Sequence, residues 1–416
     1  MKFSWQEGNK LELLINGEQY FPRVFECIRN ARKEILLETF IIFADQVGLE
    51  LKQALLEAAQ RGVCIQITVD GYGTAGLDSS YIAELTEAGI NIRMFDPSPR
   101  MLGMRTNLFR RLHRKIVVVD GEVAFIGGIN FGADHLLEYG PESKQDYAIE
   151  ARGPIVNDIR RISQDILITC AKVREFPHIE DYQQHEGKSL ALVAVRDNAK
   201  HHRDIETHYL HALRQAQHRV VLANAYFLPS YRLLRELRKT AQRGVNVSLI
   251  LQGRPDMPWA RACTSLIYNY LVQHGVTIYE YCQRPLHAKV AVVDDEWCTV
   301  GSSNLDPLSL SLNLEANLII RDADLNRQLH EDLSSLATNH CEKITARIAV
   351  RGRWWRAPLA SLCFHFLRHF PAMAGMLPAH TPKLEIVTTE ILDEVVEAVA
   401  EEENIDMMKD RSAAEK

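Results

Sequence analysis

The sequence contains one unit twice, and this duplication limits the possible folds more than any other feature. The pentapeptide AQRGV occurs at residues 59–63 and again at 241–245. In both copies a helix-like stretch precedes it and a β-rich run follows, CIQITVDG in the first and NVSLILQG in the second. A glycine at a helix end, followed by β-branched residues, indicates a helix stop and a strand start. The chain is therefore expected to fold as two similar units.

Each copy also begins in the same way, with a helical segment that leads into a near-continuous apolar run. Runs of this kind are typical of central strands that are covered on both faces. Alternating helices and strands indicate an α/β fold with right-handed crossovers between parallel strands. The predicted helices are 18–32 and 203–218, and the predicted strands are 34–43, 116–121 and 124–128 in the first copy and 219–228, 290–295 and 298–302 in the second.

The length of 416 residues suits two halves of ordinary domain size followed by a C-terminal extension. The predicted segments are a first half, a second half, a basic and aromatic segment that could contact a membrane, and an acidic tail, at 1–175, 176–340, 341–380 and 381–416. The tail holds eleven acidic and four basic residues, so the formal net charge of −6 leaves the rest of the chain close to neutral. A dedicated nucleic-acid-binding protein would be strongly basic, and nucleic acid is therefore not expected as a partner.

Two eighteen-residue segments carry the candidate chemistry. HRKIVVVDGEVAFIGGIN (113–130) aligns without a gap on HAKVAVVDDEWCTVGSSN (287–304), and eight of the eighteen positions are identical. The shared side chains include a histidine, a lysine, an aspartate and an asparagine at equal spacing. The candidate catalytic residues are His113, Lys115, Asp120, His287, Lys289 and Asp294. The candidate phosphate-binding residues are Asn130, Asn304 and Ser302.

These residue types suit a reaction at a phosphodiester. Side chains two apart on a strand share a face, so each histidine is expected to point the same way as its lysine. Lysine ammonium groups and asparagine amides can hold the non-bridging oxygens as negative charge develops. One imidazole can attack phosphorus while the other protonates the leaving alkoxide and later deprotonates the incoming alcohol or water. The scheme needs no metal and no cofactor, and none is predicted.

The paired HxKxxxxD motifs, followed by GGIN or GSSN, resemble the phospholipase D superfamily over nearly all of residues 10–335. Within it, NLFRRLHRKIVVVDG (107–121) and LHAKVAVVD are most similar to bacterial cardiolipin synthases, nearest to the short B type without N-terminal membrane spans. The resemblance implies two phospholipase D-like halves related by a pseudo-two-fold axis. It also implies an enzyme that transfers a phosphatidyl group between two phosphatidylglycerol molecules through a phosphohistidine and releases glycerol.

The resemblance also implies individual roles. His113 would be the nucleophile and His287 the acid and base, while Asp120 and Asp294 are similar to carboxylates that brace a loop. In the superfamily an acidic residue beyond each motif orients a histidine of the opposite half. We therefore expect Asp146 to pair with His287 and Glu315 to pair with His113. The first motif departs from many relatives by ending in GGIN, so that only Ser302 can supply a motif hydroxyl.

Other functions share these residues and stay open at this point. Water in place of the second alcohol would make the enzyme a phospholipase D-type hydrolase, and a soluble phosphodiester would make it a nuclease. Phosphatidylethanolamine could also serve as the donor, and a lipid-binding scaffold without activity is a further alternative. The chain shows no secretory signal and no run of about 18–20 apolar residues that could span a membrane. We expect a peripheral protein on the cytoplasmic side of the inner membrane, with phospholipid and the membrane surface as partners; its oligomeric state is not predicted.

Overall fold

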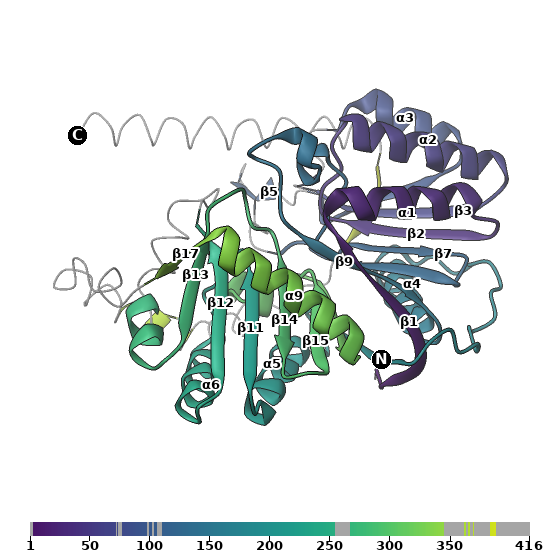
Figure 1. Cartoon of the computed structure of the whole chain (residues 1–416). Coiled ribbons are helices and arrows are strands. Elements are labelled where there is room, and N and C mark those ends of the chain that lie inside the picture. The colour runs from purple at the N-terminus through teal and green to yellow at the C-terminus, as the bar shows by residue number, and fades with distance from the viewer. Residues whose placement is uncertain are drawn as a thin grey trace, which may run out of the picture.

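The two copies of the repeat contribute strands to one continuous mixed sheet (Figure 1). The structure is a computed structural model. It describes residues 3–344 apart from 72, 74–76, 98–99, 102–103, 106–109 and 254–266, and also residues 362, 365, 366, 369 and 383–387. The sixteen strands follow the order β17-β13-β12-β11-β14-β15-β16-β10-β1-β9-β8-β7-β2-β3-β4-β18. This order reads the same way outward from the centre in both directions, so each strand of one half has a counterpart in the other.

The antiparallel pair of β1 and β10 lies at the centre and joins the halves. On each side, three parallel strands continue into an antiparallel run that returns to the centre. The strands of the first half are β1 Gln6–Ile15, β2 Glu34–Thr39, β3 Cys64–Asp70, β4 Asn91–Phe95, β7 Ile116–Val119, β8 Val123–Gly127 and β9 Tyr147–Arg152, with a separate hairpin of β5 Arg100–Met101 and β6 Met104–Arg105. Those of the second half are β10 Ser189–Arg196, β11 Arg219–Asn224, β12 Asn246–Gln252, β13 Thr277–Tyr281, β14 Lys289–Val293, β15 Trp297–Gly301, β16 Glu315–Arg321 and β17 Cys341–Ile344.

The helices cover the sheet in layers. The helices of the first half are α1 Asn16–Asn30, α2 Gln46–Gln60, α3 Ser79–Glu87 and α4 Ile155–Ala171, with short 3-10 turns η1 Ala133–His135 and η2 Leu137–Tyr139. Those of the second half are α5 Asp204–Gln215, α6 Tyr231–Gln242, α8 Pro307–Ser311 and α9 Ala323–Asn339. Apolar side chains of α1, α2 and α3 form one outer core, and those of α5 and α6 form another. Helices α4 and α9 pack into a third core that contains strands of both halves.

The local sequence accounts for these elements. In α1 the buried residues include Tyr20, Val24 and Ile28, which recur at every fourth position and give the helix one apolar face. The carboxylate of Asp45 accepts from the backbone N–H groups at the start of α2, as an N-cap does. The glycines of the repeated pentapeptide, Gly62 and Gly244, have φ values of 82° and 92°, a left-handed conformation that glycine adopts without a steric penalty.

The predicted α/β architecture of two similar halves is confirmed, but the first strand of each copy is shorter than expected. The apolar runs predicted at 34–43 and 219–228 end as strands at Thr39 and Asn224. Beyond these points the runs continue as single bridges, Ile42 with Phe131 and Phe227 with Leu305. Ile42 and Phe227 are still buried beyond the strand ends, so the apolar pattern alone does not mark where the strand ends.

The outermost strands of both halves come from the C-terminal part of the chain. β17 pairs with β13 at one edge of the sheet, and β18, Leu384–Ile386, pairs with β4 at the other. Most of the predicted basic and aromatic segment 341–380 and of the acidic tail 381–416 lies outside the described residues, and the boundaries proposed between the segments stay predictions. Among the described helices, none is long and apolar enough to cross a membrane.

Candidate active site

Two short backbone bridges between the halves position the motif histidines. Leu112 bridges Leu314, and Leu286 bridges Gln145. In the first bridge the N–H of His113 donates to the carbonyl of Leu314 at 3.0 Å, and in the second the N–H of His287 donates to the carbonyl of Gln145 at 2.8 Å. Each histidine therefore lies on an extended segment just before its strand and is held by the opposite half. Strands β7 and β14 begin after the histidines, as the predicted strands 116–121 and 290–295 do, so the argument from the alternating faces of one strand does not apply to the histidines.

The bridges explain how each histidine meets a carboxylate from the other half. The residue after Leu314 is Glu315, and its Oε2 lies 3.0 Å from His113 Nδ1. The residue after Gln145 is Asp146, and its Oδ2 lies 2.5 Å from His287 Nδ1. Both predicted pairings are therefore confirmed as contacts. Because each Nδ1 faces a carboxylate, Nε2 is the ring nitrogen left for the substrate.

The two pairs differ in electrostatics. Burial would raise the pKa of Glu315, but His113, Lys115 and the Ser302 hydroxyl bring it below its ordinary value. Burial raises the pKa of Asp146, and Lys289 only partly opposes this. Glu315 is thus the more firmly ionised of the two acids. Burial lowers the pKa of His113, and it holds the pKa of His287 well below the ordinary value, with Lys289 adding to the effect. Burial therefore disfavours the protonated form of both rings in the absence of substrate, and more strongly that of His287.

The motif lysines converge with the histidines in the interior. Lys115 and Lys289 are 2% and 0% exposed. Each ammonium group donates to the carbonyl of the histidine two residues earlier. Burial, together with the neighbouring Lys289, lowers the pKa of Lys115 to about 7, and burial lowers that of Lys289 to about 8. Two buried cations next to each other favour an anionic ligand, because a phosphate would offset their repulsion.

The asparagines are buried and have amide oxygens without hydrogen-bond partners. Asn130 and Asn304 are 2% and 5% exposed, and their Oδ1 atoms make no hydrogen bond within the described part of the chain. Amide oxygen and nitrogen positions are assigned from the surrounding hydrogen bonds. A buried amide without partners can therefore turn its N–H₂ group toward a phosphate oxygen.

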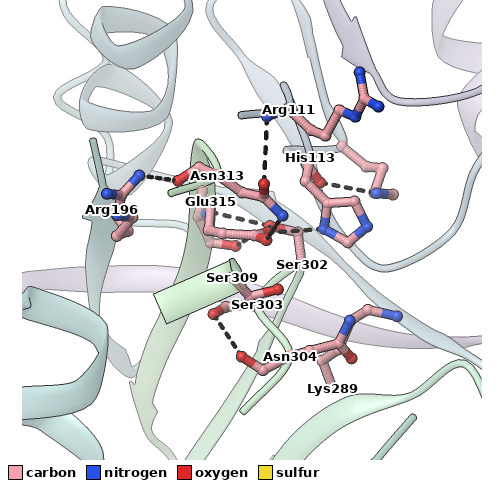
Figure 2. A network of polar contacts seen from close by, with 12 residues as sticks. Arg111, His113, Arg196, Lys289, Ser302, Ser303, Asn304, Ser309, Asn313 and Glu315 are labelled. Carbon is pink, nitrogen blue, oxygen red and sulfur yellow. Dashed lines mark hydrogen bonds and ion pairs between the residues drawn. The ribbon is translucent and has the colours of Figure 1, made fainter. Parts of the chain in front are cut away.

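Ser302, predicted to bind phosphate, contacts the acid that faces His113. Its hydroxyl donates to Glu315 Oε2 at 2.5 Å and accepts from the N–H of Ala316 at 3.1 Å (Figure 2). The hydroxyl is thus engaged with the acid that faces His113, and this contact assigns Ser302 to holding Glu315. At the matching position of the first motif stands Gly128, where an added Cβ would lie 2.4 Å from Asp146 Oδ1. The GGIN ending therefore leaves room for the shorter acid.

A wider polar network holds Glu315. Asn313 Nδ2 lies 3.4 Å from Glu315 Oε1, and Asn313 Oδ1 accepts from the N–H of Arg111 (Figure 2). Arg196, which is 3% exposed, donates to the carbonyl of Asn313 at 2.6 Å. These contacts connect the Glu315 carboxylate to the end of β10. Sequence reasoning missed Arg196 and Asn313 because neither lies within a motif.

Asp120 and Asp294, proposed as catalytic from their place in the motifs, lie apart from the histidines. Asp120 accepts from the backbone N–H groups of residues 32, 33 and 34 at the start of β2. Asp294 accepts from those of residues 217, 218 and 219 at the start of β11. Both residues have positive φ, 54° and 48°, as turn aspartates can. They brace two equivalent corners of the sheet, in agreement with the loop-bracing role that the resemblance implied.

Two further side chains at the site were missed by sequence reasoning. The Phe40 ring lies 5.2 Å from the His113 ring and 5.2 Å from the Lys115 ammonium. The His135 ring, which is completely buried, lies 5.6 Å from that of His287. His135 stands five residues after Asn130, and its type and position after the motif were the only available signal. Among the described residues, donor atoms of His135, Asp146 and His287 lie close enough together to hold a metal ion.

The arrangement can carry out nucleophilic and acid–base chemistry at one phosphorus atom. The two halves bring their motif side chains close enough for His113 to affect the pKa of His287, and Lys289 that of Lys115. The site thus holds two imidazoles, two buried lysine side chains and two amides. Because the histidines keep 12% and 16% side-chain exposure, a substrate can reach them while the lysines stay buried.

Comparison with known proteins finds similarity over most of the chain. A family model described as cardiolipin synthase, phospholipase D-like domain, matches residues 24–157 and 209–337. Cardiolipin synthase B of Escherichia coli K12 is 52% identical over 387 residues, which span 92% of this chain and 94% of that protein. Cardiolipin synthase A of Pseudomonas syringae is 34% identical over 79% of this chain and 68% of its own length.

A solved structure shows that the fold extends to more distant proteins. The crystal structure of phosphatidylserine synthase from Haemophilus influenzae superposes with a TM-score of 0.62 at 15% identity, covering 88% of this chain and 94% of the other. At this identity the likeness concerns the fold alone.

Proposed function

The chain belongs to the cardiolipin synthase family of phospholipase D-like proteins, and we propose that it transfers a phosphatidyl group from one phosphatidylglycerol to another. The products are cardiolipin and glycerol. The observation that carries this proposal is the pair of histidines, each facing a carboxylate of the opposite half, beside two buried lysines. Such a site can divide one transfer into two displacements at phosphorus.

In the first displacement, Nε2 of His113 attacks the phosphorus of the donor lipid. The bond from phosphorus to the glycerol headgroup oxygen breaks, and that oxygen takes a proton from Nε2 of His287, which enters the step as an imidazolium and leaves it neutral. The anionic phosphodiester bound beside the ring favours this protonated form. Once His113 is phosphorylated on Nε2, its ring is a cation. The Nδ1–H of this cation points at Glu315. A firmly ionised carboxylate stabilises such a cation, and Glu315 is the more firmly ionised of the two acids. This difference supports His113 as the nucleophile.

In the second displacement, a glycerol hydroxyl of another phosphatidylglycerol attacks the same phosphorus. His287 takes the hydroxyl proton, and the bond from phosphorus to His113 breaks. Lys115 and Lys289 with Asn130 and Asn304 would hold the non-bridging oxygens in both steps. Asp146 would keep the His287 ring oriented through Nδ1 while Nε2 exchanges the proton.

The proposed substrates are phospholipids, and the proposed place of action is the cytoplasmic face of the inner membrane. The family relation supports a membrane-associated bacterial enzyme, and the described helices include none that could span a membrane. A peripheral protein that takes its substrates from the bilayer surface agrees with both observations.

The test is the product of the purified protein on vesicles of phosphatidylglycerol. We expect cardiolipin and glycerol in equal amounts, and a rate reduced about 10²- to 10⁴-fold in His287→Ala, because acid–base catalysis contributes about that much. Acid quenching followed by mass spectrometry should find the phosphatidyl group on His113. Phosphatidic acid as the sole product would contradict transfer, and a label on His287 would reverse the two roles.

A further inference from the structure

A third histidine lies next to the acid–base pair, although two-step transfer does not require it. His135 is fully buried, and its ring meets that of His287 edge to face, with 75° between the ring planes. One ring nitrogen of each histidine and one carboxylate oxygen of Asp146 lie within 4.8 Å of one another. The three side chains come from η1, from the residue just before β9, and from the segment before β14, so the fold assembles this cluster from both halves.

One nitrogen of His135 is not engaged. The N–H of Asn130 donates to His135 Nε2 at 3.3 Å, whereas Nδ1 is buried and makes no hydrogen bond among the described residues. A buried polar atom without a partner is unfavourable, because the hydrogen bond that it makes to water in the unfolded chain is not replaced. The ring can therefore offer Nδ1 to a ligand without losing a hydrogen bond.

The cluster has no equivalent in the other half. By motif alignment, the counterpart of His135, five residues after the asparagine, is Ser309. Ser309 is buried at the start of α8, where its backbone N–H donates to the carboxylate of Asp306. The second half therefore places Glu315 and His113 together without a third strong metal ligand. The second half contributes a complete motif without a histidine at this position. The reaction steps that both motifs serve therefore do not explain why His135 is present.

We propose that His135, Asp146 and His287 form a binding site for a divalent transition metal ion of the Zn²⁺ type, and that the bound ion blocks the enzyme. Two imidazoles and one carboxylate are a ligand set that Zn²⁺ binds readily, whereas Mg²⁺ prefers oxygen ligands and would bind weakly. The bound ion takes the place of protons on the imidazole nitrogens. His287 can then no longer move the proton that the reaction requires. The blocking part of this proposal rests on the proposed function, whereas the binding part does not.

Binding can be measured on the full-length protein without lipid. Co²⁺, a spectroscopic substitute for Zn²⁺, should give visible absorption bands of a protein site that saturate at one ion per chain and are displaced by Zn²⁺. In His135→Gln and, separately, Asp146→Asn, affinity should fall at least about tenfold, while Ser309→Ala, the matched change in the other half, should bind as the wild type does. Thermal unfolding of each variant shows whether it is folded. Equal affinity in folded His135→Gln and in the wild type would overturn the site.

Inhibition is measured as cardiolipin formation with added Zn²⁺, Mg²⁺ or a chelator. Zn²⁺ should stop the reaction and the chelator should restore it, Mg²⁺ should have no such effect, and His135→Gln should need at least about tenfold more Zn²⁺ relative to its own rate. Inhibition should weaken as pH falls, because protons compete for the imidazoles. Full activity with the site saturated would overturn the block. A protein that makes no cardiolipin under any condition would contradict the proposed function, while the absorption measurement would still decide the site.

Discussion

At the scale of single residues, the two halves hold their histidines with acids of different length. Asp146 is one carbon shorter than Glu315, so its carboxylate lies closer to the backbone, against Gly128. Glu315 reaches further and leaves space for Ser302, whose hydroxyl binds it. The glycine and the aspartate therefore form one matched pair, and the serine and the glutamate form another.

This matching predicts that Gly128→Ser damages the enzyme and that a second change repairs it. The new side chain would displace the Asp146 carboxylate from His287. A hydrogen bond to a charged group contributes about 1.5–3 kcal/mol, so kcat should fall about 10- to 100-fold. The double variant Gly128→Ser/Asp146→Glu copies the second half and should recover most of the loss. Steady-state kinetics of the two single variants and the double variant checks this, and additive losses would refute the pairing.

The buried lysines predict a pH dependence. With pKa values of about 7 for Lys115 and about 8 for Lys289, both ammonium groups lose their protons as pH rises from 7 to 9. The site then loses positive charge where the phosphate binds, so kcat/KM should fall over this range. Unfolding stability should move the other way: unfolded lysines stay protonated to about pH 10.4, and stability rises with pH wherever the unfolded chain binds more protons. A kcat/KM profile that is flat between pH 7 and 9 would contradict the assignment.

At the scale of elements, the active site depends on backbone contacts that no motif reveals. The sequence was sufficient to predict the two halves, the strands that carry the motifs and the two histidine–acid pairs, the last through family resemblance. It could not reveal the bridges of Leu112 with Leu314 and of Leu286 with Gln145, because these unite segments far apart in the chain. The contact of the Ser302 hydroxyl with Glu315 was also not predicted, because the motif gives no sign of a side chain thirteen residues further along.

The bridge at Gln145 can be tested through its backbone N–H, which donates to the carbonyl of Pro285 at 2.9 Å. Gln145→Pro removes this donor, and we expect kcat to fall at least about tenfold because Asp146 and His287 lose their common support. Gln145→Ala keeps the donor and removes side-chain contacts, which include those to Asn16, Tyr147 and Arg284, so it is the matched control. Equal activity of the two folded variants would show that the bridge does not position the pair.

At the scale of the whole molecule, the C-terminal part of the chain returns to the first half. β18 pairs with β4, and the adjacent Val387 is 3% exposed within the outer core formed by α1, α2 and α3. The strand therefore protects an edge of the sheet that lies far from it in the sequence. Sequence reasoning assigned this region to an acidic tail, because three residues of strand among acidic neighbours give no clear periodicity.

Val387→Asp should destabilise the protein, because it buries a carboxylate without a partner. We expect a loss of several kcal/mol and a lower midpoint of thermal unfolding. Ile386→Asp is the matched control, since Ile386 is 59% exposed and is the last residue of β18, directly before Val387. Its midpoint should stay close to that of the wild type. Equal midpoints for the two variants would show that β18 does not contribute to the stability of the first half.

Because two unequal halves are joined in one chain, the two histidines can have different surroundings and different roles. A symmetric dimer of identical subunits would give both rings the same surroundings, and the same proton affinity with them. In each displacement, one ring must have a free Nε2 while the other carries a proton or the phosphoryl group. In this chain Glu315, which Ser302 holds, contacts the His113 ring. Asp146 contacts the His287 ring, and the His135 ring lies beside it. Linking the copies lets each ring specialise while keeping the geometry that symmetry provides.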